Sequence, residues 1–448
     1  MGKFFGTDGV RGVANRELTC ELAIKLGRAA AKVLTGNCGH SAKILIGKDT
    51  RISSDMLENA LLAGIASVGA KGISLGVVPT PAVSYLVKKY NADAGIMISA
   101  SHNSFEFNGI KFFNKDGYKL TDEIEDSIEK LVEGNEELSL PIGEKLGKIL
   151  KCESAIDDYT NYLCETFEGN IENLKIAVDC ANGSASATAG KIFSEINSNA
   201  TILFDNPDGI NINENCGSTH LGKLSEYVVK NKCDIGIAFD GDADRCLLID
   251  NNGKIVDGDI ILALCAKYLK DNGKLTNNTL VATIMSNMGL KEFCKKNDIN
   301  LSETKVGDRY VLERMLEKNY SIGGEQSGHV IFGDLSSTGD GQLTALQILN
   351  ILSKTGKSIS ELSSQFVKYP QKQSEVKIEL SQKGLLKNNE KIQEYIKNAT
   401  AKLGSSGRIL IRESGTEPKI RIMVECLDEK KLDSLIEEAR IVVSENLK

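Results

Sequence analysis

Three aspartates spaced two residues apart are the strongest chemical signal in the sequence. Asp240, Asp242 and Asp244 follow the apolar run at residues 235–239. A short curled loop at a strand end lets carboxylates with this spacing converge on a divalent cation, without which they repel one another. An EF-hand loop opens in the same way but needs glycine at position six and glutamate at position twelve, where this chain has Arg245 and Asn251. The pattern favours a divalent-cation site over a solvated acidic turn, which seldom follows so apolar a strand.

Two further loops carry polar groups, one suited to sugar hydroxyls and the other to phosphate. Residues 323–329 follow a strand-like segment, and the side-chain acceptors of Glu325 and Ser327 suit sugar hydroxyls. The other loop joins two predicted strands near the end of the chain and has the components of a phosphate nest. These components are guanidinium groups, hydroxyl groups and backbone amides that glycine leaves accessible, and they belong to Arg412, Ser414, Gly415, Thr416 and Arg421. A tight structural turn and a plain hairpin loop are the respective alternatives.

Ser101 and His102 stand where the apolar run at residues 94–98 ends in the polar stretch SASHN. A serine hydroxyl is a poor nucleophile unless a base, a metal or a prepared phosphoryl group assists it. The G-x-S-x-G pattern of many hydrolases is missing, and no downstream aspartate and histidine form an evident triad. Because the chain also has a cation loop and a phosphate loop, Ser101 is better interpreted as a carrier of phosphate.

Length, charge and cysteine usage exclude several classes of protein. A chain of 448 residues should form about three or four domains. The net charge of −7 argues against nucleic acid or an anionic membrane as a partner. The eleven cysteines form no C-x-x-C pair, which disfavours zinc and disulfides and fits a reducing compartment. Glycines, prolines and a lysine interrupt the most apolar stretch, residues 61–83, and the amino terminus has no secretion signal. We therefore expect a cytoplasmic protein.

Short apolar runs that end in polar clusters alternate with helical periodicity through most of the chain. This pattern predicts parallel strands joined by crossover helices, with runs at residues 43–48, 95–98, 175–179, 234–240 and 279–285. Hairpins are expected near residues 112–118 and 247–256. From about residue 371 the order changes to a strand at 376–380, a helix at 389–401, strands at 408–411 and 419–425, and a last helix. The polar ends of the parallel strands should line a shared crevice.

Four motifs, in order along the whole chain, resemble those of the α-D-phosphohexomutase family. They are the serine stretch, the aspartate triplet, GEQSGH at residues 324–329 and the phosphate loop, and the opening MGKFFGTDGVRG adds to the match. The resemblance implies three similar α/β domains and a fourth α+β domain, like a TATA-box-binding protein, around a central cleft. The expected domains are residues 1–153 with the catalytic serine, 154–254 with the metal loop, 255–369 with the sugar loop, and 370–448 with the phosphate loop.

The resemblance also implies roles for individual residues. Ser101 would carry phosphate, and its phosphate oxygen would join the three aspartates in binding one Mg²⁺ ion per active site. Lys111 and Arg11 would lie against the transferring group, and His102 and His329 would move protons. The substrate-binding residues would be Gly324, Glu325, Ser327, Arg245, Arg412, Ser414, Gly415, Thr416 and Arg421.

The implied reaction interconverts glucosamine 6-phosphate and glucosamine 1-phosphate through a phosphoserine and a glucosamine 1,6-bisphosphate. This reaction would feed the synthesis of UDP-N-acetylglucosamine and cell-wall precursors. Gln326 favours the amino sugar, since hexose enzymes of the family often have methionine there and an amide carbonyl can accept from a 2-ammonium group. A phosphomannomutase or phosphoglucomutase of the same fold, a non-catalytic phosphosugar-binding protein and a magnesium-dependent phosphatase are the alternatives. The expected partner is a small phosphosugar, and a homodimer is one option for assembly.

Two positions depart from the family pattern. Family members usually have proline after S-H-N and an acid just before the N-G pair, where this chain has Ser104 and Phe107. We expect a less rigid loop and a missing acidic neighbour for Lys111, and hence altered rates rather than lost activity.

Overall fold

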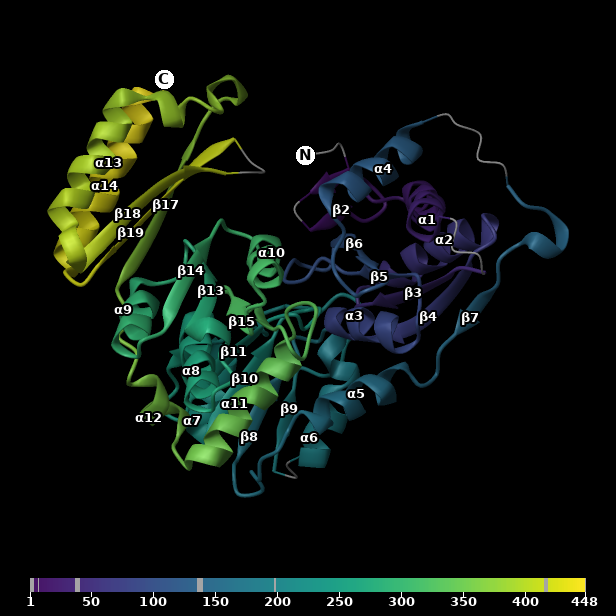
Figure 1. Cartoon of the computed structure of the whole chain (residues 1–448), viewed down its shortest axis with the longest axis horizontal. Helices are drawn as coiled ribbons and strands as arrows, with labels where there is room; N and C mark the ends of the chain where they lie inside the picture. The colour runs from purple at the N-terminus through teal and green to yellow at the C-terminus, as the bar shows by residue number, and fades with distance from the viewer. Residues whose placement is uncertain are drawn as a thin grey trace. The chain divides into compact units, whose positions relative to one another are not determined.

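The computed structural model describes residues 4–6, 8–36, 41–134, 140–196, 199–414 and 418–447. The chain divides into two compact units (Figure 1). The first contains Met1–Met285 and Ile299–Ser364, and the second contains Ser286–Asp298 and Gln365–Lys448. No helix among the described residues is both long and apolar enough to cross a membrane.

The first unit begins with a mixed seven-stranded sheet in the order β1-β2-β6-β5-β3-β4-β7. Its strands are β1 (Phe5–Gly6), β2 (Gly9–Val13), β3 (Lys43–Lys48), β4 (Lys71–Val77), β5 (Ala94–Ile98), β6 (Phe107–Asn114) and β7 (Ile149–Lys151). Its helices are α1 (Cys20–Thr35), α2 (Ser54–Ser67), α3 (Thr80–Lys89) and α4 (Asp122–Glu133). The strand β3 is parallel to β4 and β5, whereas β6 is antiparallel to β2 and β5.

Alternating residues of β3 and β5 explain how helices cover this sheet on both faces. Ile44 and Ile96 pack in one core with side chains of α1, α2 and α4. On the other face Gly95 leaves room for α3, because a Cβ there would lie 2.6 Å from a methyl carbon of Val87. The polar ends of β3 and β5 are thereby fixed at one edge of a rigid sheet.

A second, five-stranded sheet carries the aspartate triplet. Its order is β12-β11-β10-β8-β9, from β8 (Ile176–Asp179), β9 (Thr201–Leu203), β10 (Ile235–Phe239), β11 (Cys246–Asp250) and β12 (Ile255–Val256). The helices of this segment are α5 (Ala155–Glu165), α6 (Ala189–Ile196) and α7 (Gly222–Asn231). The predicted hairpin at 247–256 is present, since β11 is antiparallel to β12.

The third sheet carries the predicted sugar loop. Its order is β14-β13-β15-β16, from β13 (Thr279–Thr283), β14 (Asn300–Thr304), β15 (Ile322–Gly324) and β16 (Val330–Phe332). Helices α8 (Gly258–Asp271), α10 (Asp308–Lys318), α11 (Gly341–Thr355) and α12 (Ile359–Ser363) belong to the same segment. The sugar loop connects β15 to its antiparallel neighbour β16.

The second unit is a three-stranded antiparallel sheet, β17-β19-β18, with two long helices. Its elements are β17 (Gln371–Lys377), β18 (Gly407–Glu413), β19 (Lys419–Cys426), α13 (Glu390–Leu403) and α14 (Glu429–Asn446). Helix α9 (Met288–Lys296) also belongs here, because the Asn287 side chain donates to the Tyr369 carbonyl at 3.0 Å and to Glu425 Oε1 at 3.1 Å. The sequence did not indicate that this helix leaves its neighbours in the chain.

The predicted strand at residues 376–380 is placed too late in the chain. Strand β17 begins at Gln371 and pairs with β19 as far as Lys377, and residues 380–382 form a short 3₁₀ helix. Most side chains of β17 are polar and exposed, so its apolar pattern is weak. Backbone pairing with β19 rather than side-chain burial sets its position.

Candidate active site

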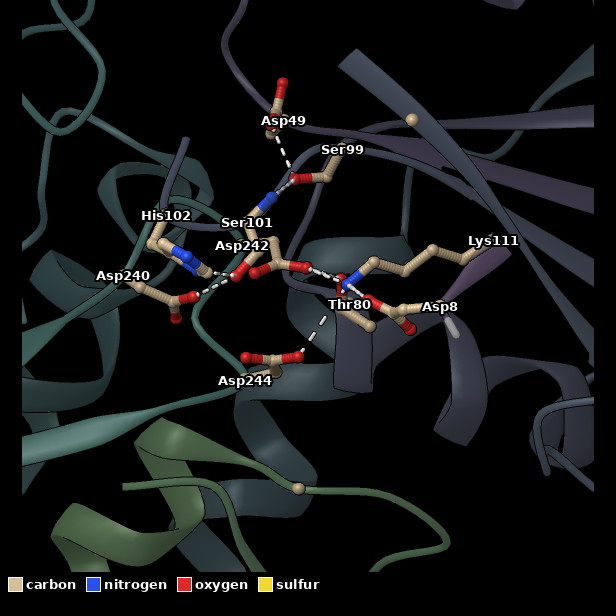
Figure 2. A network of polar contacts seen from close by, with 12 residues as sticks. Asp8, Asp49, Thr80, Ser99, Ser101, His102, Lys111, Asp240, Asp242 and Asp244 are labelled. Carbon is tan, nitrogen blue, oxygen red and sulfur yellow. Dashed lines mark hydrogen bonds and ion pairs between the residues drawn. The ribbon is translucent and has the colours of Figure 1, made fainter. Parts of the chain in front are cut away.

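Ser101 and the aspartate triplet come from different sheets and meet directly. The Ser101 hydroxyl donates to Asp240 Oδ2 at 2.6 Å (Figure 2). Ser101 is 2 % exposed and has a positive φ of 52°, a strained conformation often found at functional sites. The two loops are in close contact, because a Cβ on Gly241 would lie 2.5 Å from the Ser101 carbonyl oxygen. The predicted convergence of the two strand ends therefore occurs.

The triplet has the geometry and the chemistry of a metal site. One oxygen from each of the three buried carboxylates lies within 4.8 Å of the others. Asp242 Oδ1 and Asp244 Oδ1 are buried and accept no hydrogen bond from the described residues. Burial, and then the charges of Asp244 and Asp242, raise the pKa of Asp240. Since buried carboxylate oxygens without partners are costly, these residues fit a hard divalent cation such as Mg²⁺.

Lys111 is buried beside the triplet. Its Nζ lies 2.7 Å from Asp242 Oδ2, 3.1 Å from Asp8 Oδ2 and 3.7 Å from Asp244 Oδ2. Burial opposes the charged form, but Asp242 and Asp8 outweigh it and raise the pKa of Lys111. Lys111 thus has acidic neighbours although Phe107 replaces the usual acid, so the expectation that such a neighbour is missing was wrong. The partner comes from a distant segment that the local motif does not include.

His102 lies next to the serine hydroxyl, with its Nδ1 3.3 Å from Ser101 Oγ. Burial, followed by the positive charges of Arg245 and Arg11, lowers the pKa of His102 to about 4. The imidazole is therefore neutral near pH 7 and has a nitrogen that can accept a proton.

His329 is buried between two carboxylates. Its Nδ1 lies 3.6 Å from Asp244 Oδ2, and its Nε2 lies 3.6 Å from Asp308 Oδ2. Burial lowers the pKa of His329, but the charge of Asp244 outweighs burial and raises it. The Gly339 amide nevertheless donates to Nε2 at 3.1 Å, which requires a ring nitrogen without hydrogen. This contact assigns the neutral ring to His329, with its hydrogen on Nδ1, facing Asp244.

The sugar loop is held by a hydrogen bond within its own backbone and by a hydrogen bond from Gly307. The Glu325 amide donates to the His329 carbonyl at 2.9 Å, and Glu325 Oε1 accepts from the Gly307 amide at 3.1 Å. Burial raises the pKa of Glu325. Ser327 Oγ is buried and has no hydrogen-bond partner among the described residues. The loop therefore retains a polar atom available to a ligand.

Two arginines of the predicted site lie near the triplet. Arg245 Nε is 3.8 Å from Asp244 Oδ1 and makes no hydrogen bond to the described residues. Arg11 is exposed and forms an ion pair with Asp8, which also contacts Lys111. The first unit thus brings together the serine, the triplet, both histidines, Lys111, Arg245 and, through Asp8, Arg11.

The predicted phosphate loop belongs to the second unit. Arg412 and Arg421 are directly opposite each other on β18 and β19. Burial, and then the charge of Arg421, lower the pKa of Arg412, so an anion near these two arginines would be stabilised. The Ser414 amide donates to the Lys419 carbonyl at 2.8 Å. Gly415 and Thr416 lie outside the described residues.

Several residues that support the site were missed by sequence reasoning. Thr80 donates to Asp242 Oδ2 at 2.6 Å, and the Asn213 side chain donates to the Ser101 carbonyl at 2.9 Å. Asp49 accepts from Ser99, whose hydroxyl in turn accepts from the Ser101 amide (Figure 2). The only available signal was that Asp49 follows a predicted parallel strand, at the edge where Ser101 was also expected.

Comparison with known proteins agrees with this arrangement. The phosphoglucomutase/phosphomannomutase models for α/β/α domains I, II and III match residues 2–139, 157–253 and 257–369, and the model for the C-terminal domain matches residues 375–442. Proteins named phosphoglucosamine mutase from Clostridium novyi and Clostridium beijerinckii are 54% and 55% identical to the chain over 436 residues, which is 97% of each sequence.

Solved structures with low identity show the same fold. A phosphoglucomutase/phosphomannomutase family protein from Burkholderia thailandensis superposes with a TM-score of 0.82 at 22% identity, covering 99% of this chain and 97% of that one. An Aspergillus fumigatus N-acetylphosphoglucosamine mutase, solved with GlcNAc-6P and magnesium, gives 0.73 at 16% identity, covering 100% and 96%. The predicted class of three α/β domains and an α+β domain is confirmed, and the chain belongs to the phosphoglucomutase/phosphomannomutase family.

Proposed function

We propose that the chain is an isomerase that interconverts glucosamine 6-phosphate and glucosamine 1-phosphate. The observation that carries this proposal is the contact of the Ser101 hydroxyl with Asp240, beside Lys111 and two buried carboxylate oxygens that accept no hydrogen bond from the described residues. A protein that only bound phosphosugars would not need this cluster. The names of the Clostridium relatives support the amino sugar as substrate.

In the proposed reaction, phosphorylated Ser101 transfers its phosphoryl group to O1 of glucosamine 6-phosphate. The neutral imidazoles of His102 and His329 are proposed to accept the hydroxyl proton of the sugar as the new P–O bond forms and to supply the proton that the serine oxygen gains as the old bond breaks. The resulting glucosamine 1,6-bisphosphate turns around and returns its 6-phosphoryl group to Ser101. The neutral ring of His102 lies within 3.3 Å of the serine oxygen and can carry the proton there.

Charge neutralisation is the main task of the site, because a metaphosphate-like transition state needs little covalent assistance. When bound to Asp240, Asp242, Asp244 and an oxygen on Ser101, Mg²⁺ would neutralise charge on the transferring group. Lys111 adds a buried positive charge in direct contact with Asp242 of the triplet. Arg11 is proposed to contact the same group, and His329 is the second proton carrier.

The remaining roles concern the sugar and the phosphate that does not react. Glu325 and Ser327, with Gly324 and Arg245, are proposed to bind the sugar and its phosphate. The phosphate clamp would use Arg412, Ser414, Gly415, Thr416 and Arg421. Because the bisphosphate presents either end, this clamp has to accept two poses, which a mobile last domain would assist.

The function is tested by turnover of three substrates after the protein has been treated with glucose 1,6-bisphosphate and Mg²⁺. We expect glucosamine 1-phosphate to be used better than glucose 1-phosphate and mannose 1-phosphate, and the intact mass to show one phosphoryl group on Ser101. Preference for a neutral hexose would indicate a phosphoglucomutase or phosphomannomutase. A protein that gains no phosphoryl group would be a binding protein, and phosphate release faster than isomerisation would indicate a phosphatase.

We also propose the cytoplasm as the place of this reaction, since its product would enter UDP-N-acetylglucosamine and cell-wall precursor synthesis. The four domain boundaries, at residues 1–153, 154–254, 255–369 and 370–448, are part of the same proposal. Each matched family range falls inside one of these segments, which supports the boundaries.

A homodimer is proposed through the edge strand β7 of the first sheet. Five large apolar side chains are exposed within and just before this strand, which pairs only with β4 among the described strands. They are Leu140, Ile142, Leu146, Ile149 and Leu150. Exposed apolar edge strands pair readily with a second chain. Light scattering should give a dimer for the wild type and a monomer for Ile149→Glu, and a monomeric wild type would exclude the dimer.

A further inference from the structure

Lys119 joins the part of the first unit that carries the serine to the part that carries the sugar loop. Its Nζ lies 2.5 Å from Asp8 Oδ1 and 2.6 Å from Asp308 Oδ2. Asp8 lies between β1 and β2, whereas Asp308 is the first residue of α10 and is 189 residues from Lys119 in the sequence. The Lys119 side chain is 15% exposed, so this bridge is largely shielded from water.

The Asp308 end of the bridge lies against the sugar loop at two points. Asp308 Oδ2 lies 3.6 Å from Nε2 of His329. The preceding residue, Gly307, donates its amide to Glu325 Oε1 at 3.1 Å. Gly307 has a φ of 127°, which residues with a side chain rarely adopt. Glycine at this position therefore permits the backbone conformation that directs the amide toward Glu325. A shift of the α10 start would therefore move the hydrogen-bond partner of Glu325 and a neighbour of His329 together.

The Asp8 end of the bridge reaches the phosphoryl-transfer residues. While Asp8 Oδ1 contacts Lys119, Asp8 Oδ2 lies 3.1 Å from Nζ of Lys111 (Figure 2). Lys111 in turn contacts Asp242 and Asp244, and Asp244 lies near His329. These side chains thus form a closed ring of polar contacts, each of 3.7 Å or less, in the order Lys111, Asp8, Lys119, Asp308, His329, Asp244. Lys119 is the member of this ring that spans the serine and sugar-loop segments and is neither a predicted ligand nor a predicted proton carrier.

We propose that Lys119 is a positioning residue that fixes the sugar loop relative to Ser101 through its bridge between Asp8 and Asp308. This inference rests on the proposed function and deepens it, because it names what sets the distance between the sugar and the phosphoserine. Small displacements of a bound substrate cost much of the rate of a positioned reaction. Removing the ammonium group would also leave two largely buried carboxylates facing each other.

The test is a double-mutant cycle of Lys119→Met and Asp308→Asn, read as kcat/KM for glucosamine 1-phosphate. In each single variant kcat/KM should fall about tenfold or more. In the double variant kcat/KM should be little lower than in the less active of the two single variants. Lys119→Arg, which keeps the charge, should recover activity to within about threefold of the wild type. Additive losses, or wild-type kinetics for Lys119→Met, would overturn the proposal.

A second readout separates positioning of the sugar from general damage. In the absence of sugar, the phosphoserine of Asp308→Asn should be hydrolysed at the same rate as that of the wild type, because hydrolysis does not use the sugar loop. Equal slowing of transfer to water and to sugar would contradict a positioning role. The matched control is the Arg309–Asp122 ion pair, which joins the same two segments but has Asp122 72% exposed. Arg309→Met and Asp122→Asn should leave kcat/KM unchanged.

The outcomes also separate this inference from the proposed function. If the wild type converts none of the three hexose phosphates, the function fails before the bridge is tested. If the wild type converts glucosamine 1-phosphate and Lys119→Met does so equally well, only the role of Lys119 fails. Should Lys119→Met not fold, Asp308→Asn and Lys119→Arg still decide the question, since the first keeps the size of the side chain and the second keeps the positive charge of the bridge.

Discussion

The guanidinium of Arg51 donates to the carbonyl oxygen of Ser101 at 2.9 Å. The Arg51 side chain is completely buried, and its Nε is paired with Asp49 Oδ2 at 2.8 Å. Its remaining hydrogens are donated within the same serine loop, to the carbonyls of Asn103, Ser104 and Phe107. One side chain thus holds four carbonyls of the loop that lacks the usual proline. We expect this clamp, together with the hydrogen bond from the Asn213 side chain to the Ser101 carbonyl, to limit the loss of rigidity that Ser104 predicts.

Replacing Arg51 with lysine should release the serine loop. Lysine keeps the charge but lacks the planar fork that reaches several carbonyls. We expect kcat to fall about a hundredfold and the first unit to lose about 2–3 kcal/mol of stability, since buried carbonyls lose their donors. Turnover assays and thermal unfolding measure the two effects. Arg16→Lys, at an exposed position, is the control, and wild-type activity of Arg51→Lys would contradict the clamp.

Replacing Ser101 with alanine should abolish isomerisation and leave the fold intact. The variant lacks the oxygen that would carry phosphate, while the single hydrogen bond to Asp240 is a small part of the packing there. Circular dichroism should match the wild type, and the intact mass should show no added phosphoryl group. Ser104→Ala removes an exposed hydroxyl from the same loop and should retain both activity and phosphorylation. Substantial turnover by Ser101→Ala would refute the carrier role.

Removing a carboxylate charge from the triplet should weaken the dependence on magnesium. In the wild type, Mg²⁺ should raise the unfolding temperature, because the cation binds only the folded arrangement of the three aspartates. In Asp242→Asn this rise should shrink, and activity should fall at least about a hundredfold. Chelation of the metal should likewise stop turnover by the wild type. An Asp242→Asn variant with the same magnesium titration as the wild type would rule out the ligand assignment.

Asp340 should make stability depend on pH. Burial raises the pKa of this carboxyl to about 6, above the 3.8 of an exposed aspartate, although the Leu343 amide and the Tyr159 hydroxyl donate to it. The folded state therefore binds more protons between these two values, and stability falls as the pH rises through this interval. Asp340→Asn keeps the cap and a polar contact to Tyr159 without ionising. The difference between the unfolding temperature of this variant and that of the wild type should increase as the pH is raised from 4.5 to 7.5.

The sign of this effect can be checked with Tyr159→Phe. Loss of the hydroxyl removes a hydrogen bond that favours the ionised form of Asp340, so the pKa should rise further and the pH dependence should extend to higher pH. Identical pH profiles for Asp340→Asn and the wild type would show that Asp340 does not titrate in this range.

The sequence by itself determined the α/β class and the order of the motifs, and it placed Ser101 and the aspartates at the ends of strands. These features can be predicted because they depend on local patterns. Alternating or near-continuous apolar runs specify strands, and the polar residues that follow parallel strands lie at one edge of a sheet. Ser101 and Asp240 are 139 residues apart, yet each could be placed at a strand end, because each follows, within three residues, a buried strand with a parallel neighbour.

Only the tertiary structure decided which side chains hold these groups in place. Arg51, Asn213 and Lys119 lie in turns or beside hairpins, where no periodicity indicates a direction, and their partners are 50 to 189 residues away. Asp8 replaces the acid that Phe107 does not supply, and α9 packs with the last unit rather than with its chain neighbours. Contacts of this kind depend on how separate sheets and helices are placed against one another, and a pattern along the chain records only which face of each element is buried.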